Sequence, residues 1–111
     1  MTGPAPAIEP PYWAVIFTNQ RRDDEQDEEY DRTAQRMEQL AREVPGYVGI
    51  ESVRDSSGFG ITVSYWESEV AIAAWRNHPE HLETQARGRR DWYERYELRV
   101  ARVERTASFD A

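Results

Sequence analysis

Apolar and polar residues alternate in four stretches of this chain, at residues 12–19, 47–54, 59–66 and 96–105. A period of two is typical of β-strands, because successive side chains point to opposite faces of a sheet. We therefore predict a strand at each of these places. In the first strand both alternating sets are apolar: Trp13, Val15 and Phe17 on one face, and Tyr12, Ala14 and Ile16 on the other. Both faces of this strand are expected to be buried.

The segment after the first strand is predicted to be a long helix. Apolar residues recur in it at helical spacing, and Asp23 and Gln26 have the spacing of a capping box. The helix is expected to end near Val44, before Pro45 and Gly46. Proline disfavours helical geometry in the residue before it, and glycine accepts a left-handed turn.

A second helical region follows the strand at 59–66. Ser68 is placed to cap a short helix, and Pro79 fits the first position of another, since its missing N–H would have no partner there. In the second helix one stripe is formed by Leu82, Ala86, Arg89 and Tyr93, and an adjacent, more polar stripe by His81, Gln85, Gly88 and Trp92. The polar stripe is where we expect a functional site.

The predicted order of elements is β-α-β-β-α-β, the ferredoxin-like arrangement of an α+β protein. Residues 1–11, rich in proline, are expected to form a flexible arm, residues 12–105 the domain, and residues 106–111 a tail. The helices of such a fold cover only one face of the sheet. Because the first strand is apolar on both sides, the other face needs cover from a second copy of the chain, and we predict a homodimer.

The composition limits the classes of partner. The chain has 111 residues, of which 21 are acidic and 14 basic, and its net charge of −7 argues against nucleic acid or an anionic membrane surface as a partner. It contains no cysteine, which fits a reducing cytoplasm. No apolar stretch approaches the ~20 residues of a membrane span, and residues 1–11 lack the features of a signal peptide. We expect a soluble cytoplasmic protein.

The motifs of several enzyme and metal-binding classes are absent. No GxGxxG, GxxxxGK[ST] or GxSxG occurs, so dinucleotide-binding, phosphate-loop and serine-hydrolase functions lose their usual support. His78 and His81 lie in HPEH, not HExxH, and we expect no metal there. The acidic run at 23–29 is expected to be the solvated start of a helix. A cation site would need a loop that folds these carboxylates around one point.

Residues 60–96 hold three of the four tryptophans and both histidines. Their order is YW, AW, H, Q, GR and WY, and the stretch is preceded by PGY and followed by RVARVER. In these motifs and their spacing, residues from about 13 to 105 resemble the antibiotic biosynthesis monooxygenase (ABM) family. The resemblance implies a dimeric α/β barrel in which the last strand often reaches across to the partner chain.

The resemblance implies one of two chemistries. Some ABM proteins are cofactor-independent oxygenases that convert aromatic anthrones to quinones, in which tryptophan, asparagine and other polar groups stabilise a substrate carbanion that itself reduces oxygen. Asn19, Trp66 and Trp75 are residues of these types. Others degrade haem with an asparagine on the first strand, a tryptophan on a helix and an iron-ligating histidine. Asn19 and Trp75 correspond to the first two, whereas Gln85 stands where that histidine is expected and His81 lies one turn earlier.

From the resemblance we expect a monooxygenase, without metal or other cofactor, that acts with O2 on a small aromatic, polyketide-like substrate. A haem-degrading enzyme and a non-catalytic small-molecule-binding domain are the alternatives. The expected catalytic residues are His81, Asn19 and Trp75, and the expected substrate-binding residues are Trp66, His78, Gln85 and Trp92.

Each of these residues also has a purely structural interpretation. The tryptophans Trp66 and Trp75 can be core residues, His78 a helix cap, and His81 a histidine hydrogen-bonded at the edge of the core. Fold analogy alone does not establish a function. The enzymatic hypothesis requires His81, Asn19 and Trp75 to converge on one cavity.

Overall fold

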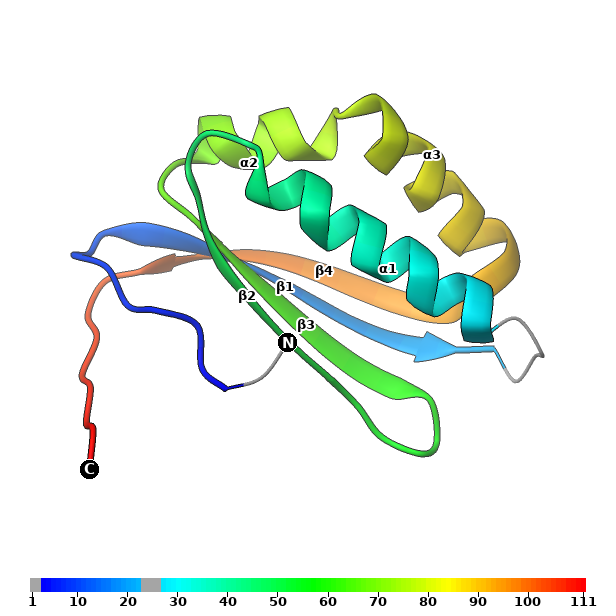
Figure 1. Ribbon diagram of the computed structural model, residues 1–111, viewed down its shortest axis with the longest axis horizontal. Helices are drawn as coiled ribbons and strands as arrows, with labels where there is room; N and C mark the ends of the chain where they lie inside the picture. The colour runs from blue at the N-terminus through cyan, green and yellow to red at the C-terminus, as the bar shows by residue number, and fades with distance from the viewer. Residues whose placement is uncertain (1–2, 23–26) are drawn as a thin grey trace.

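The computed structural model describes residues 3–22 and 27–111. Within these ranges the elements follow one another in the order β1 (Tyr12–Arg21), α1 (Asp27–Arg42), β2 (Tyr47–Arg54), β3 (Phe59–Trp66), α2 (Glu69–Arg76), α3 (Pro79–Arg87) and β4 (Tyr93–Val103). A π-helical turn at Gly88–Trp92 joins α3 to β4. The predicted α+β, ferredoxin-like arrangement is confirmed (Figure 1). None of the helices in the described ranges is both long and apolar enough to cross a membrane.

The strands form one antiparallel sheet in the order β2-β3-β1-β4. β1 lies inside the sheet, so its backbone is hydrogen-bonded on both sides, to β3 and to β4. The register places Asn19 opposite Gly60 of β3 and opposite Tyr96 of β4. Side chains directly opposite one another point to the same face of a sheet. The register therefore decides which side chains of the three strands lie beside one another.

The helices α1, α2 and α3 lie on the same side of the sheet (Figure 1), and the core between the two layers centres on Trp66. Trp66 is 0% exposed, and its ring packs edge-on against Tyr47 with 5.5 Å between centroids. Its Nε1 donates to Ser64 Oγ at 2.9 Å. A large ring is thus buried with its polar group satisfied, which is the favourable way to bury a tryptophan.

The junction between α2 and α3 is built from two side-chain caps. Ser68 Oγ accepts a hydrogen bond from the Ala71 N–H at 3.1 Å at the start of α2. His78 Nδ1 accepts one from the Glu80 N–H at 3.2 Å at the start of α3, where Pro79 occupies the first turn as predicted. The chain therefore bends between α2 and α3 instead of continuing as one helix (Figure 1).

β4 begins at Tyr93, earlier than the predicted residue 96. The prediction that Tyr93 continues a helical stripe with Leu82 was wrong, and Leu82 itself is 46% exposed. The Tyr93 N–H donates to Gly88 O in the π-helical turn, and the Tyr93 ring packs edge-on against Phe17 with 5.3 Å between centroids. This contact with the sheet places Tyr93 in a strand, although its spacing from Leu82 in the sequence is that of a helix.

The first helix ends at Arg42, close to the predicted residue 44. Its predicted capping box, Asp23 and Gln26, lies outside the described residues. The acidic run at 23–29, considered above as a cation site, falls partly in the same gap. After the helix, Gly46 has a φ of 95°, the left-handed turn that the sequence predicted.

The N-terminal arm contacts the sheet face that the helices leave uncovered, which we call the open face. The Ala5 N–H donates to Glu51 Oε2 at 2.8 Å, and the Tyr65 hydroxyl donates to Glu51 Oε1 at 2.6 Å. Burial, followed by the bond to Glu51, raises the pKa of Tyr65 to about 12. The Tyr12 ring packs edge-on against Tyr65 with 6.0 Å between centroids. The arm therefore covers one end of the open face.

Gly46 and Gly58 provide a matched pair of stability tests, because both have positive φ, 95° and 89°. A Cβ at Gly46 would lie 2.7 Å from Ala71 Cβ, whereas a Cβ at Gly58 would lie 3.1 Å from the flexible end of Gln20. We expect Gly58→Ala to lower the free energy of unfolding by about 1 kcal/mol, the cost of a left-handed alanine. Gly46→Ala should lower it by about 3 kcal/mol, because steric overlap adds to that cost. Urea unfolding measures both losses, and equal losses would contradict the packing argument.

Candidate functional site

Polar and aromatic side chains gather on the helix-facing side of the sheet where β1 ends and β4 begins. In this region the register pairs Phe17 with Leu98, Asn19 with Tyr96 and Arg21 with Tyr93. Paired residues share a face, and alternate residues of one strand share it too. These six side chains therefore lie on one surface, which we call the Asn19 end of the sheet.

Asn19 is the most unusual residue of this surface. It is 2% exposed, yet neither its Oδ1 nor its Nδ2 has a hydrogen-bond partner in the part of the chain that the structure describes. A buried polar group without a partner costs roughly 1–3 kcal/mol. Such groups are rare in native proteins, and a role in binding or catalysis is one of the established reasons for keeping them.

A cation lies beside this amide because residue 60 is glycine. The Arg54 guanidinium passes so close over Gly60 that a Cβ there would lie 2.7 Å from Arg54 Cζ. Gly60 is the β3 residue directly opposite Asn19. Arg54 is held in place by donating to Gly58 O at 2.6 Å and to the Tyr30 hydroxyl at 2.8 Å. Its charge is therefore fixed next to the Asn19 position.

Arg21 adds a second cation at the same end of the sheet. Its Cζ lies 3.8 Å from the centroid of the Tyr30 ring, and its Nε donates to Trp92 O at 3.3 Å. The Tyr30 ring packs edge-on against Trp92 with 5.3 Å between centroids. Trp92 is buried, and its Nε1 has no hydrogen-bond partner among the described residues. Trp92, predicted to contact substrate, thus lies in this cluster.

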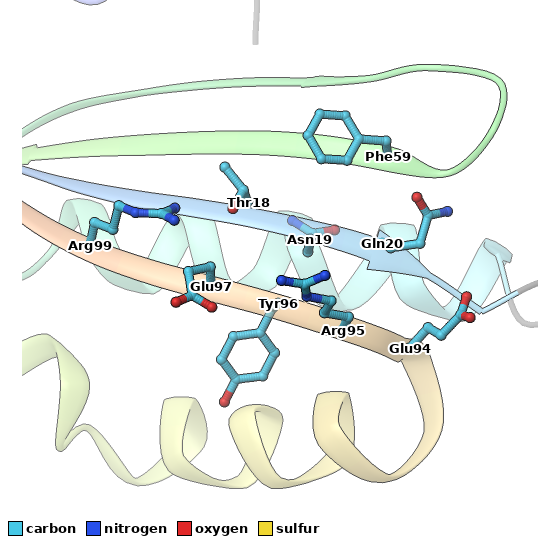
Figure 2. Close-up of a pocket in the computed structure, with 9 residues that line it drawn as sticks. All are labelled: Thr18, Asn19, Gln20, Phe59, Glu94, Arg95, Tyr96, Glu97 and Arg99. Carbon is cyan, nitrogen blue, oxygen red and sulfur yellow. The ribbon is translucent and has the colours of Figure 1, made fainter.

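An apolar strip of β4 remains uncovered beside this cluster. Leu98 and Val100 point to the helix-facing side of the sheet, yet they are 55% and 46% exposed. Tyr96, the next residue on this side, extends from β4 toward α3 (Figure 2). Apolar surface next to a few fixed polar groups is typical of small-molecule sites. The strip and Asn19 together have this composition.

His81 and Trp75, two of the predicted catalytic residues, come together at the junction of α2 and α3. Their rings are stacked, with 4.0 Å between centroids and 14° between planes. His81 Nδ1 lies 3.0 Å from Trp75 O, and because a carbonyl oxygen only accepts, Nδ1 carries the hydrogen. Burial lowers the pKa of His81, so the ring is neutral at pH 7 and its Nε2 carries no proton.

His78 and Gln85 lie near this pair, but both are tied to the backbone. The His78 ring is 5.7 Å from Trp75 between centroids, and its Nδ1 caps α3, the structural role weighed for it above. Gln85 Nε2 donates to Arg76 O at 3.0 Å. Within residues 3–22 and 27–111, no three His, Asp or Glu side chains gather as a metal site would require.

The predicted site residues therefore lie in three places. Trp75, His78, His81 and Gln85 lie at the junction of α2 and α3, Asn19 and Trp92 at the Asn19 end of the sheet, and Trp66 in the core. Trp66 is paired with Trp13, which the strand rise of ~3.3 Å per residue puts about 20 Å from Asn19. The unpartnered amide of Asn19 makes no hydrogen bond to His81. The hollow that Asn19 lines, described next, is lined by neither His81 nor Trp75. The convergence of all three residues on one cavity, expected above, is therefore not seen among the described residues.

A hollow of about 630 Å³ lies on the open face of the same strands. Figure 2 shows its lining, which comprises Thr18, Asn19, Gln20, Phe59, Glu94, Arg95, Tyr96, Glu97 and Arg99. Most of these side chains belong to the set that alternates with the helix-facing one. Arg95, Glu97 and Arg99 give the hollow a charged lining, unlike the largely apolar lining typical of pockets for aromatic ligands.

Four residues that lie at or contact the Asn19 end were not predicted as site residues from the sequence: Arg21, Tyr30, Arg54 and Tyr93. Tyr30 has the spacing of an ordinary apolar residue of the first helix, and Tyr93 was assigned to the second. The one available signal was Gly60, because a glycine inside a strand often marks the close approach of another group. That group is Arg54, but only the fold brings it there.

The sequence matches a known protein family and one curated relative. The family model described as antibiotic biosynthesis monooxygenase, ABM, matches residues 13–87. The chain is also 52% identical over 101 residues to the uncharacterized protein YqjZ of Bacillus subtilis (strain 168). This alignment covers 91% of the present chain and 87% of YqjZ.

Solved structures share the fold at low sequence identity. SnoaB from Streptomyces nogalater, described as a cofactor-independent oxygenase, superposes with a TM-score of 0.73 at 13% identity, covering 87% of this chain and 97% of SnoaB. PA3566 from Pseudomonas aeruginosa does so with a TM-score of 0.70 at 16% identity, covering 91% and 100%. These TM-scores show a common fold. The match to the family model over residues 13–87 shows that this chain belongs to the antibiotic biosynthesis monooxygenase family.

Proposed function

We propose that this protein is a cofactor-independent monooxygenase that uses O2 to oxidise a small aromatic, polyketide-like substrate. The observation that carries the proposal is the Asn19 amide, buried without a partner beside a fixed arginine and the uncovered Leu98–Val100 strip. A fixed amide N–H stabilises negative charge that develops on a substrate oxygen. SnoaB, which has the same fold, is described as a cofactor-independent oxygenase, and this supports the same type of activity here.

The proposed reaction converts an activated CH2 group between aromatic rings into a C=O group. A base removes one proton, and the resulting carbanion is delocalised as an enolate onto an existing substrate oxygen. The carbanion transfers electrons to O2 and a C–O bond forms, giving a hydroperoxide. The O–O bond then breaks and the second hydrogen of the CH2 group leaves in water. One CH2 and one O2 thus give one C=O and one water, with every electron supplied by the substrate.

The three predicted catalytic residues each have a proposed role in this reaction. The Asn19 N–H donates to the enolate oxygen, which is the charge that develops during proton removal. His81, neutral and with an unprotonated Nε2, is the proposed base, and its stack on Trp75 fixes the orientation of the ring. Because Asn19 and His81 are separate in the structure, the proposed substrate is an extended polycyclic compound that lies along the β4 strip.

We also propose that the protein is a homodimer that buries the open face. This face carries the apolar Ala14, Ile16 and Val63, which the helices of the same chain do not cover. Ile16→Glu should convert the dimer into a monomer. Dimer formation would bury the new carboxylate with no positive charge to pair with it, which is strongly unfavourable. Sedimentation velocity measures the change. Leu82→Glu, on the exposed side of α3, is the control and should remain dimeric. A wild-type protein that sediments as a monomer would contradict the proposal.

Asn19→Leu is expected to raise stability and to remove most of the activity. Leucine is similar in size and needs no hydrogen-bond partner, so the free energy of unfolding in urea should rise by about 1 kcal/mol. Oxygen uptake with 1,8-dihydroxy-9(10H)-anthrone should fall about 100-fold, the usual effect of removing one donor to a developing oxyanion.

Asn77→Leu is the control for this experiment, because Asn77 is an exposed asparagine at the end of α2 and should leave oxygen uptake unchanged. A wild-type protein that accelerates no oxygen uptake would contradict the oxygenase. If it nevertheless binds the corresponding quinone, the non-catalytic binding domain is the better description.

A haemin titration followed at the Soret band distinguishes the haem-degrading alternative from the cofactor-independent oxygenase. Gln85, at the position where the family resemblance places the iron ligand, donates its amide to Arg76 O. His81, one turn earlier, has one ring face covered by Trp75. We therefore expect no saturable binding of one haem per protomer, and the same weak response from His81→Ala. Saturable binding that His81→Ala abolishes would overturn the cofactor-independent mechanism.

A further inference from the structure

Three charged residues follow one another on the open face of β4. Arg95, Glu97 and Arg99 are alternate residues of this strand, so their side chains point to the same side of the sheet, at a spacing of about 6.6 Å. They line the hollow described above (Figure 2). All three are exposed, and their charged groups have no ion pair or hydrogen bond within residues 3–22 and 27–111. These residues, with the signs plus, minus, plus, are called the β4 charge row.

Apolar residues lie directly beside the β4 charge row. The register pairs Arg99 with Ile16 of β1, and Ile16 is paired in turn with Val63 of β3. Glu97 lies one step along the same face, opposite Thr18. Side chains that are paired across two strands have Cβ atoms about 5 Å apart. A partner that covers Ile16 and Val63 therefore also covers Arg99 and Glu97.

The N-terminal arm directs a partner toward this part of the open face. Tyr12 and Ala14, at the start of β1, are already buried within the single chain, where they are 5% and 6% exposed. Gly49 is buried at the same end, and a Cβ at Gly49 would lie 3.0 Å from Ala5 Cβ of the arm. A second copy thus finds this end of the open face occupied. The uncovered part is the one that holds Ile16 and the β4 charge row.

A second copy of the chain carries the charges that this row needs. Removing a charged group from water costs several kcal/mol unless an opposite charge meets it. In a dimer with two-fold symmetry, a contact between one residue and a different residue of the partner occurs twice, with the two residues exchanged. A row of alternating signs matches its own copy when the two rows run in opposite directions and are offset by one step. Each arginine–glutamate contact across the axis then gives two ion pairs.

We propose that Glu97 and Arg99 form reciprocal ion pairs with the partner's Arg99 and the partner's Glu97, and that these pairs set the register of the homodimer. The inference rests on the homodimer proposed above and names the residues that each copy contributes to the other. Arg99 lies beside Ile16, which the partner covers. Arg95 lies further out, opposite Gln20, and is not part of the pair. The order of signs makes this surface selective for a chain with the same order.

The test reverses one charge at a time. Glu97→Arg brings positive groups together across the axis, and Arg99→Glu brings negative groups together. Each variant alone should raise the dissociation constant of the dimer about 100-fold, the size expected for disrupting close charge pairs in an interface. Sedimentation velocity over a range of protein concentrations measures this constant.

Mixing the two variants should restore the contact. The two chains then carry opposite charges at both positions, so every arginine meets a glutamate and a heterodimer forms. Native mass spectrometry identifies the heterodimer by its mass. The double variant Glu97→Arg/Arg99→Glu exchanges the two charges within one chain and should dimerise by itself. Both rescues also exclude misfolding as the cause of the losses in the single variants.

Two controls change the net charge by the same amounts outside the open face. Arg102→Glu reverses a charge on the helix-facing side of β4, where residue 102 lies opposite Trp13. Glu83→Arg reverses an exposed charge on α3. Both should dimerise like wild type. Arg95→Glu should weaken the dimer less than Arg99→Glu does, and the opposite order would overturn the proposed pair.

The outcomes separate this inference from the proposals on which it depends. A wild-type protein that is a monomer would overturn both the homodimer and the ion pairs. A wild-type dimer whose single variants dimerise equally well would overturn the ion pairs alone, as would single variants that do not associate on mixing. Monomeric single variants that form a heterodimer on mixing would uphold the ion pairs, whatever the oxygen-uptake assay gives.

Discussion

The hydrogen bonding of β1 on both of its edges is the constraint on which the rest of the structure depends. Its register with β3 and β4 cannot slip without breaking two ladders at once. A slip of one residue would turn Asn19 to the open face and Thr18 toward the helices. The same register places Trp13 beside Trp66 in the core. The backbone bonds that hold the core together therefore also set the geometry of the candidate site.

Buried polar side-chain atoms are hydrogen-bonded at one end of the helix-facing surface but not at the other. In the core, Trp66 donates its indole N–H to Ser64, a partner only two residues away on the same strand. At the other end, Asn19 and Trp92 are buried with side-chain polar atoms that no described residue satisfies. The indole N–H of Trp66 has a hydrogen-bond partner, whereas the described residues offer none to the indole N–H of Trp92. The unpaired groups lower stability at the Asn19 end of the sheet. That place coincides with two fixed arginines and an uncovered apolar strip, which is why we propose it as the ligand-binding site.

The sequence predicted the elements well where local chemistry decides them. Ser68, Pro79 and Gly46 act at their own positions, so their roles as caps and turn could be read from residue type. Tyr93 could not be placed, because its contact with Phe17 comes from strands distant in sequence. For the same reason, the nomination of Asn19 came from family resemblance, and its missing partners became visible only when the sheet register and burial were known.

The charge distribution of the protein affects whether a ligand approaches as an anion or as a neutral molecule. The chain carries a net charge of −7, yet Arg21 and Arg54 lie at the Asn19 end. The carboxylate next to Arg54, that of Asp55, is engaged by its own turn, where it accepts from the N–H groups of Ser57 and Phe59. Long-range repulsion disfavours the approach of an anion, although salt screens it beyond about 10 Å. An uncharged ligand avoids that repulsion and meets the arginines only at contact range, so the charge distribution favours a ligand that arrives uncharged.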